Sequence, residues 1–208
     1  MKTMTFNLKE LSLPLDRIKE EAANHWRLIL LYLIFMVGCI AGSITYSNMA
    51  NTFSEYIKKV IEIMIEASFS QNMCILSAAY LIPQVFLLLF SFSALGLPFI
   101  MLCPAACGLI TSVIVSYFYC NFGVDGAVFS LIIILPCIVG FLLMLFIGAN
   151  EGVILAEIVA SNIFTNNKQG RGDVKDFLLR YVIIFLVCVF ISALQAFCIS
   201  NFGKTLLF

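Results

Sequence analysis

Five long apolar segments limit what this chain can fold into. A helix needs about 20 apolar residues to cross the hydrocarbon core of a bilayer. The segments of that length are 26–46, 73–94, 97–120, 127–149 and 177–200. Of the 208 residues, 62% are hydrophobic and only 12% are charged, whereas roughly 25% are charged in an average soluble domain. The sequence therefore predicts an all-α, polytopic integral membrane protein with five transmembrane helices.

The positions of lysine and arginine predict the orientation of these spans, because cytoplasmic loops carry an excess of both residues. With the N-terminus inside, nine of the 12 basic residues lie on the cytoplasmic side: Lys2, Lys9, Arg17, Lys19, Arg27, Lys168, Arg171, Lys175 and Arg180. Only Lys58, Lys59 and Lys204 lie outside. We therefore expect a cytoplasmic N-terminus and an extracytoplasmic C-terminus. The net charge is zero, so no basic field indicates a nucleic-acid partner.

Two segments outside the spans have an amphipathic pattern. Residues 1–25 predict a cytoplasmic amphipathic lead-in to a membrane domain over 26–208. Within the outer segment 47–72, apolar residues recur at helical spacing at Phe53, Tyr56, Ile57, Val60, Ile61, Met64, Ile65 and Phe69. Glu55, Lys58, Lys59, Glu62 and Glu66 occupy the other side. This pattern predicts an extracytoplasmic helix whose apolar face either packs on the bundle or the outer leaflet, or receives a partner protein.

Glycine and proline mark the ends and the interior of the middle spans. The residues that we expect to have structural roles are Gly96, Pro98, Pro104, Gly108, Gly123, Gly126 and Pro136. The first two lie where the second span turns into the third, and proline is tolerated in the first turn of a helix. Pro104 and Gly108 predict a kink and a close helix contact inside the third span. Gly123 and Gly126 belong to the turn NFGVDG before the fourth span. Pro136 interrupts this fourth span.

Interrupted helices also favour a second class of protein. The helices of transporters are often broken by glycine and proline around a site at the middle of the membrane, and Pro83, Pro104 and Pro136 each interrupt a predicted span. A permease or export subunit is therefore the alternative to a protein in which these residues serve packing alone. Gln84 is the polar span residue that such a permease would use.

The sequence contains few groups suited to catalysis or to metal binding. It has one histidine, His25, and no HExxH, GxSxG, Walker or CxxC motif. We expect most of the eight cysteines to be free packing residues, and Cys103 and Cys107 have no further metal ligand close in sequence. The sequence therefore predicts a protein that is not an enzyme and has no cofactor and no bound metal.

Two carboxylates lie within an apolar stretch after the fourth predicted span. Glu151 and Glu157 occur in GANEGVILAEIVASNIF. A carboxylate at membrane depth is costly to bury and is therefore a functional candidate. The other interpretation is structural pairing with Arg171, Lys175 or Arg180.

The centre of the chain resembles a known family. The segment GLPFIMLCPAACGLITSVIVSYFYCNFGVDGAVFSLIIILPCIVGF, residues 96–141, is similar to the centre of the stage II sporulation protein M family. The shared order is a Gly-Leu-Pro start of one span, a glycine-bearing helix, the GVDG turn and a Leu-Pro in the next span. NHWRLILLYLIFMVGCIAG also looks like the first span of that family.

This resemblance implies a non-catalytic scaffold in a bacterial cell membrane, specifically the mother-cell membrane during engulfment in endospore formation. The implied partners, besides the lipid bilayer, are peptidoglycan-degrading proteins resembling stage II sporulation proteins D and P. The resemblance assigns partner contacts to the outer helix and to the NFGVDG turn. The residues concerned are Phe53, Tyr56, Lys58, Lys59, Glu62 and Asp125.

Overall fold

The computed structural model describes residues 9–93, 95–165 and 171–207. Side chains are described in these ranges except at 9–25, 65, 125, 133, 161–165, 171–174 and 202–207. The helices are α1 (Lys9–Asn48), α2 (Ala50–Glu66), α3 (Phe69–Ser91), α4 (Leu97–Phe129), the π-helical turn η1 (Ser130–Ile134), α5 (Leu135–Thr165) and α6 (Arg171–Leu207). No strand occurs in these described ranges, so the predicted all-α fold is confirmed.

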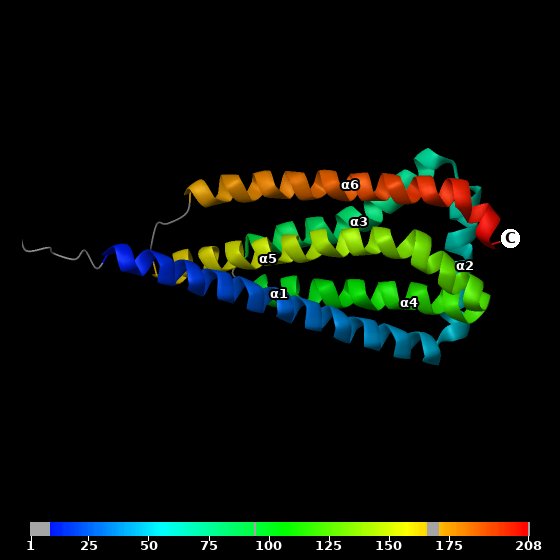
Figure 1. The fold of residues 1–208 in the computed structure, drawn as a ribbon, viewed down its shortest axis with the longest axis horizontal. Coiled ribbons are helices and arrows are strands. Elements are labelled where there is room, and N and C mark those ends of the chain that lie inside the picture. Colours follow the sequence, from blue (N-terminus) through cyan, green and yellow to red (C-terminus); the bar gives the residue numbers. More distant parts are fainter. Residues whose placement is uncertain (1–8, 94, 166–170, 208) are drawn as a thin grey trace, which may run out of the picture.

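Five of these helices contain segments long and apolar enough to cross a membrane. They are Trp26–Asn48, Phe69–Ser91, Leu97–Val124, Leu135–Ala160 and Lys175–Asn201. The predicted number and order of spans are therefore confirmed, and the chain is a multi-pass membrane protein. The five helices run side by side, with α5 between the others (Figure 1). The start of α1 and the C-terminus lie at opposite ends of the bundle, and α2 lies at the C-terminal end.

Close packing of α1 on α4 depends on glycine. A Cβ added to Gly38 would lie 2.2 Å from the backbone oxygen of Ala105, and one added to Gly42 would lie 2.5 Å from that of Leu109. From the other side, a Cβ on Gly108 would lie 2.4 Å from the Phe35 backbone oxygen. Since a helix with larger residues could not approach so closely, the close contact expected at Gly108 is present.

The turn between the second and third spans lies where the sequence predicts it. Helix α3 ends at Ser91, and α4 begins at Leu97 with Pro98 in its first turn. A Cβ on Gly96 would lie 1.9 Å from the Phe90 backbone oxygen, so only glycine can occupy this position without rearrangement. Pro104 is fully buried inside α4.

The connection between the third and fourth spans is more helical than expected. The turn NFGVDG lies within α4, whose backbone departs from helical angles at Gly123, with φ 58° and ψ −129°. This positive φ explains the glycine. A Cβ on Gly126 would lie 2.2 Å from the Phe118 backbone oxygen, so this position requires close approach instead.

Several boundaries differ from those predicted, and those of the fourth span differ most. This span runs from Leu135 to Ala160 in the structure, whereas the sequence predicts 127–149. Residues 127–134 before it are also helical, as the end of α4 and η1. Pro136 is the second residue of α5 and directly follows η1. A proline lacks the N–H of a regular helix, and the backbone is π-helical just before it. In addition, residues 9–25 continue directly into the first span as part of α1, and do not form a separate helix.

Candidate functional site

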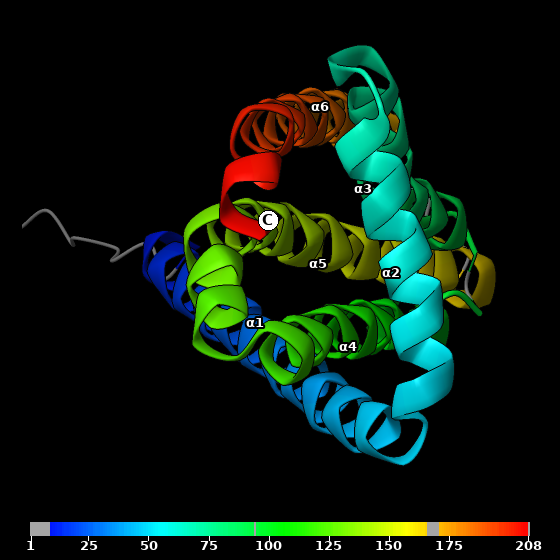
Figure 2. The same cartoon turned by 90° about the vertical axis from the view of Figure 1, so that its right-hand side faces the viewer.

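Helix α2 lies across one end of the bundle, from the last turn of α1 to the first turn of α3 (Figure 2). Its apolar side packs on the bundle, where Phe53, Ile57 and Ile61 contact a buried cluster that includes Tyr117 and Phe118. The sequence left open whether this apolar face packs on the membrane domain or receives a partner protein. In the structure it packs on the bundle.

A short, well-capped connection fixes the far end of α2. Glu66 is its last residue, and the Ser68 backbone N–H donates to Gln71 Oε1 at 3.0 Å in a capping box that starts α3. The buried Asn72 then donates from Nδ2 to the Met64 backbone oxygen at 2.7 Å. Asn72 was not predicted from the sequence, where the available signal was an amide at the start of an apolar segment.

The other side of α2 is charged and open to solvent. Lys58 Nζ lies 3.9 Å from Glu62 Oε1, and Lys59 Nζ lies 3.5 Å from Glu55 Oε1. All four side chains are more than half exposed, so these pairs contribute little to stability. They leave a row of charge along the surface of α2.

The six residues assigned to partner contacts are therefore not equivalent. Lys58, Lys59 and Glu62 lie on the exposed charged side of α2, and Tyr56 is 74% exposed. Phe53 is half-buried against the bundle. The side chain of Asp125 lies outside the described part of the structure.

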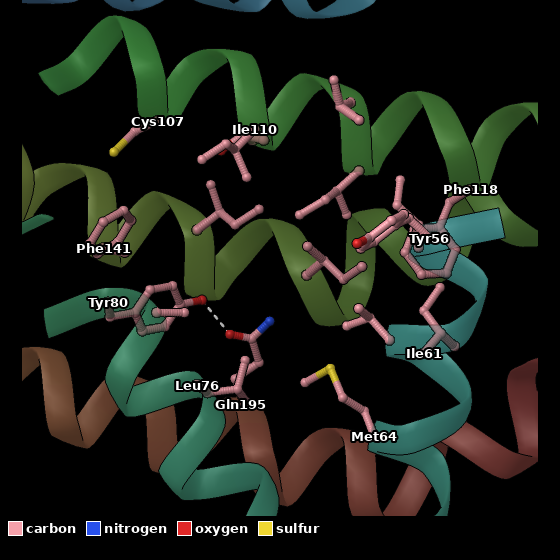
Figure 3. Close-up of a pocket in the computed structure, with 18 of the residues that line it drawn as sticks. Tyr56, Ile61, Met64, Leu76, Tyr80, Cys107, Ile110, Phe118, Phe141 and Gln195 are labelled. Carbon is pink, nitrogen blue, oxygen red and sulfur yellow. Dashed lines mark hydrogen bonds between the residues drawn. The ribbon is translucent and has the colours of Figure 1, made fainter. Parts of the chain in front are cut away.

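Beneath α2 is an apolar cavity of about 710 Å³. Side chains from α2, α3, α4, η1, α5 and α6 line it, and Figure 3 shows part of this lining. Its lining includes Ile57 and Met64 of α2, Leu76 of α3, Ile110 of α4 and Phe141 of α5. The described residues that line the cavity include no charged side chain. The volume lies within the range of small-molecule sites, roughly 300–1,000 Å³.

One polar pair lies in this cavity. The Tyr80 hydroxyl donates to Gln195 Oε1 (Figure 3), joining α3 to α6. The Tyr80 ring stacks on Phe141 with ring centroids 4.6 Å apart. The amide nitrogen of Gln195 lies on the cavity side of this bond (Figure 3). The sequence assigned a role to neither Gln195 nor Tyr80.

The opposite end of the bundle is held by ion pairs. Arg180 Nη1 lies 2.7 Å from Glu151 Oε1, one of the pairings expected for that carboxylate. Glu157 pairs instead with Arg27, at 2.6 Å, which joins α5 to α1. Both glutamates therefore link helices, as the structural interpretation of these carboxylates expects.

The interior at that end also contains neutral polar contacts. The Tyr181 hydroxyl donates to the Gly148 backbone oxygen at 2.8 Å, and Ser91 Oγ bonds the Leu87 backbone oxygen at 2.6 Å. Gln84 is fully buried next to Gly148, where a Cβ would lie 2.6 Å from Gln84 Oε1. Gln84 is thus a packed interior amide of α3.

The chemistry of the remaining groups is simple. The eight cysteines are free thiols, and among the residues with described side chains no three His, Cys, Asp or Glu groups gather as they would around a metal ion. His25 lies outside the described side chains.

Fold and site together define a class: a polytopic helical membrane protein with an amphipathic helix that covers one end of its bundle and an apolar cavity below it. No protein-family model, curated protein or solved structure matches the chain.

Proposed function

We propose that this protein is a non-catalytic membrane scaffold that holds an extracytoplasmic partner against the charged side of α2. The observation that carries the proposal is that the two sides of this helix have different surroundings. The apolar side packs on the bundle, whereas Lys58, Lys59, Glu55 and Glu62 face away from it. Exposed charges set the specificity and rate of protein association, so a helix that contacts the bundle on one side and carries charges on the other is suited to docking.

The orientation is part of the same proposal. Helices α1 and α6 both start at the bundle end opposite α2 (Figure 1), and Arg27, Lys175 and Arg180 lie in the first halves of these two helices. The bias of basic residues toward that end supports a cytoplasmic N-terminus. In that orientation α2 and the C-terminus are extracytoplasmic. The family resemblance of residues 96–141 supports a bacterial cell membrane and, as the partner class, peptidoglycan-degrading proteins similar to stage II sporulation proteins D and P.

Charge reversal on α2 tests the scaffold. In the variant Lys58→Glu with Lys59→Glu, we expect the amount of peptidoglycan-degrading protein that co-purifies with the chain to fall several-fold, because like charges then meet the partner surface. Lys175→Glu, an exposed lysine at the other end of the bundle, is the control and should retain the partner. Membrane insertion is checked by fractionation, and unchanged co-purification in the inserted double variant would contradict the proposal.

The cavity supports a second candidate, a permease or export subunit. The buried Tyr80–Gln195 pair places polar groups between spans, and Pro83 lines the same cavity. A permease moves a solute across the membrane of vesicles that contain it. Gln84 does not line the cavity, whereas Gln195 does, so Gln195→Leu is the variant that would lower this flux. Reconstituted protein that gives no flux above empty vesicles would exclude this candidate.

A further inference from the structure

We infer that the cavity beneath α2 is a binding site for a neutral, lipid-like molecule: a single hydrocarbon chain that carries a hydrogen-bond acceptor oxygen. The site is separate from the charged side of α2, so it does not depend on the scaffold proposal. Three features of the cavity lead to this ligand class, namely its level in the membrane, its opening and its polar group.

The cavity lies within the depth of the membrane-spanning helices. Its lining residues Leu76, Ile110 and Phe141 belong to the spans Phe69–Ser91, Leu97–Val124 and Leu135–Ala160. The surroundings of the bundle at this depth are lipid. Because the described lining has no charged side chain, an ionic ligand would lose its hydration without compensation. A neutral, mostly apolar molecule does not incur this desolvation cost when it enters from lipid.

The opening is on the side of the bundle, between α3 and α4. Ala79 of α3 and Ile110 of α4 line the cavity and are nevertheless exposed, Ile110 by 58%. Tyr56 and Val60 of α2 also both line the cavity and are exposed. A cavity bordered by these residues is entered from the bilayer, beside α2, so the ligand comes from the membrane.

The polar group gives the ligand its acceptor. Gln195 uses its amide oxygen to accept from Tyr80, and the amide nitrogen lies toward the cavity (Figure 3). An amide donor in an apolar space is costly unless it is hydrogen-bonded. A hydroxyl, carbonyl or ester oxygen on the ligand satisfies it, whereas a plain hydrocarbon does not.

Photolabelling of the full chain in phosphatidylethanolamine and phosphatidylglycerol vesicles tests the site. The probes are a diazirine-bearing monoacylglycerol and a diazirine-bearing alkane of the same chain length. We expect the monoacylglycerol to label the cavity-lining segments 76–83 and 107–118 several-fold more than the alkane does. Labelling spread evenly over lipid-facing residues outside these segments, such as Leu89 and Leu186, would overturn the inference.

Neighbouring alanines supply a matched control. Ala79→Phe narrows the opening and should lower labelling of the lining several-fold, whereas Ala78→Phe changes an exposed alanine that does not line the cavity and should leave it unchanged. If Ala79→Phe does not fold, Ile110→Trp and its control Leu102→Trp make the same comparison on α4, since both residues are exposed and only Ile110 lines the cavity. Equal labelling within a pair would overturn the lateral entry.

Removal of the polar pair tests the acceptor. Gln195→Leu combined with Tyr80→Phe leaves no orphaned hydroxyl. Monoacylglycerol labelling should then fall to the level of the alkane, and alkane labelling should not change. A persistent preference for the monoacylglycerol would contradict the role of Gln195.

Discussion

Gly38 of α1 faces Ala105 of α4 so closely that a Cβ on Gly38 would lie 2.2 Å from the Ala105 backbone oxygen. The obstacle is main chain, which cannot rotate away as a side chain can. Helix association inside lipid depends on such close backbone approach, since apolar side chains gain little by leaving hydrocarbon. The contact between α1 and α4 is therefore sensitive to a single methyl group.

Gly38→Ala should accordingly destabilise the protein. Forcing extra atoms into a packed interior costs about 1–3 kcal/mol, and here the two helices must separate. Thermal unfolding in detergent measures the loss. Gly140→Ala is the control, because its Cβ would meet only the end of the Ile191 side chain, at 3.1 Å. Equal melting temperatures for the two variants would contradict this account.

The ion pair between Arg27 and Glu157 should couple α1 to α5 measurably. The side chains are 29% and 47% exposed, so a double-mutant cycle with Arg27→Gln and Glu157→Gln should give a coupling of about 0.5–1 kcal/mol, at the upper end for exposed pairs. The pair Lys58–Glu62 is longer, at 3.9 Å, and more exposed. Its cycle should give a smaller value, and the reverse order would show that proximity does not measure coupling here.

Tyr181→Phe should cost about 1 kcal/mol, the net value of a typical buried hydrogen bond. The hydroxyl is the donor to Gly148 in a buried site, and its loss leaves the ring in place. Chemical unfolding in mixed micelles provides the measurement. Tyr119→Phe removes an exposed hydroxyl and should be neutral; a larger loss at Tyr119 than at Tyr181 would refute the prediction.

Asn72→Leu should loosen the end of α2 without unfolding the spans. The substitution keeps the branched shape of the side chain and removes the bond from Nδ2 to the Met64 backbone oxygen. We expect faster hydrogen–deuterium exchange in residues 60–66 and unchanged exchange in α5. Asn201→Ala serves as the control, because that amide bonds its own helix, at the Phe197 backbone oxygen. Identical exchange of α2 in both variants would show that Asn72 does not anchor this helix.

The sequence predicted correctly those features that depend on the residues of a single helix. Length and hydropathy predicted all five spans, and periodicity predicted α2, because both depend on local composition. Gly96 and Pro98 marked a turn through backbone geometry alone. The Arg27–Glu157 pair joins residues 130 positions apart, and which helices are neighbours is not written in any local pattern. The cavity is formed by several helices, and its Tyr80–Gln195 pair joins two of them. Neither could be predicted, because local sequence patterns do not show which helices are neighbours.

The short links at the two ends of α2 have a mechanical consequence. Only Met49 separates α2 from α1, and only Ala67 and Ser68 separate it from α3. A pull applied to α2 therefore has no slack to absorb it and is divided between two membrane spans. Of these two spans, α1 packs closely on α4 at its glycines, and α3 is hydrogen-bonded to α6 through Tyr80. Load on this single surface helix is thus borne by most of the bundle.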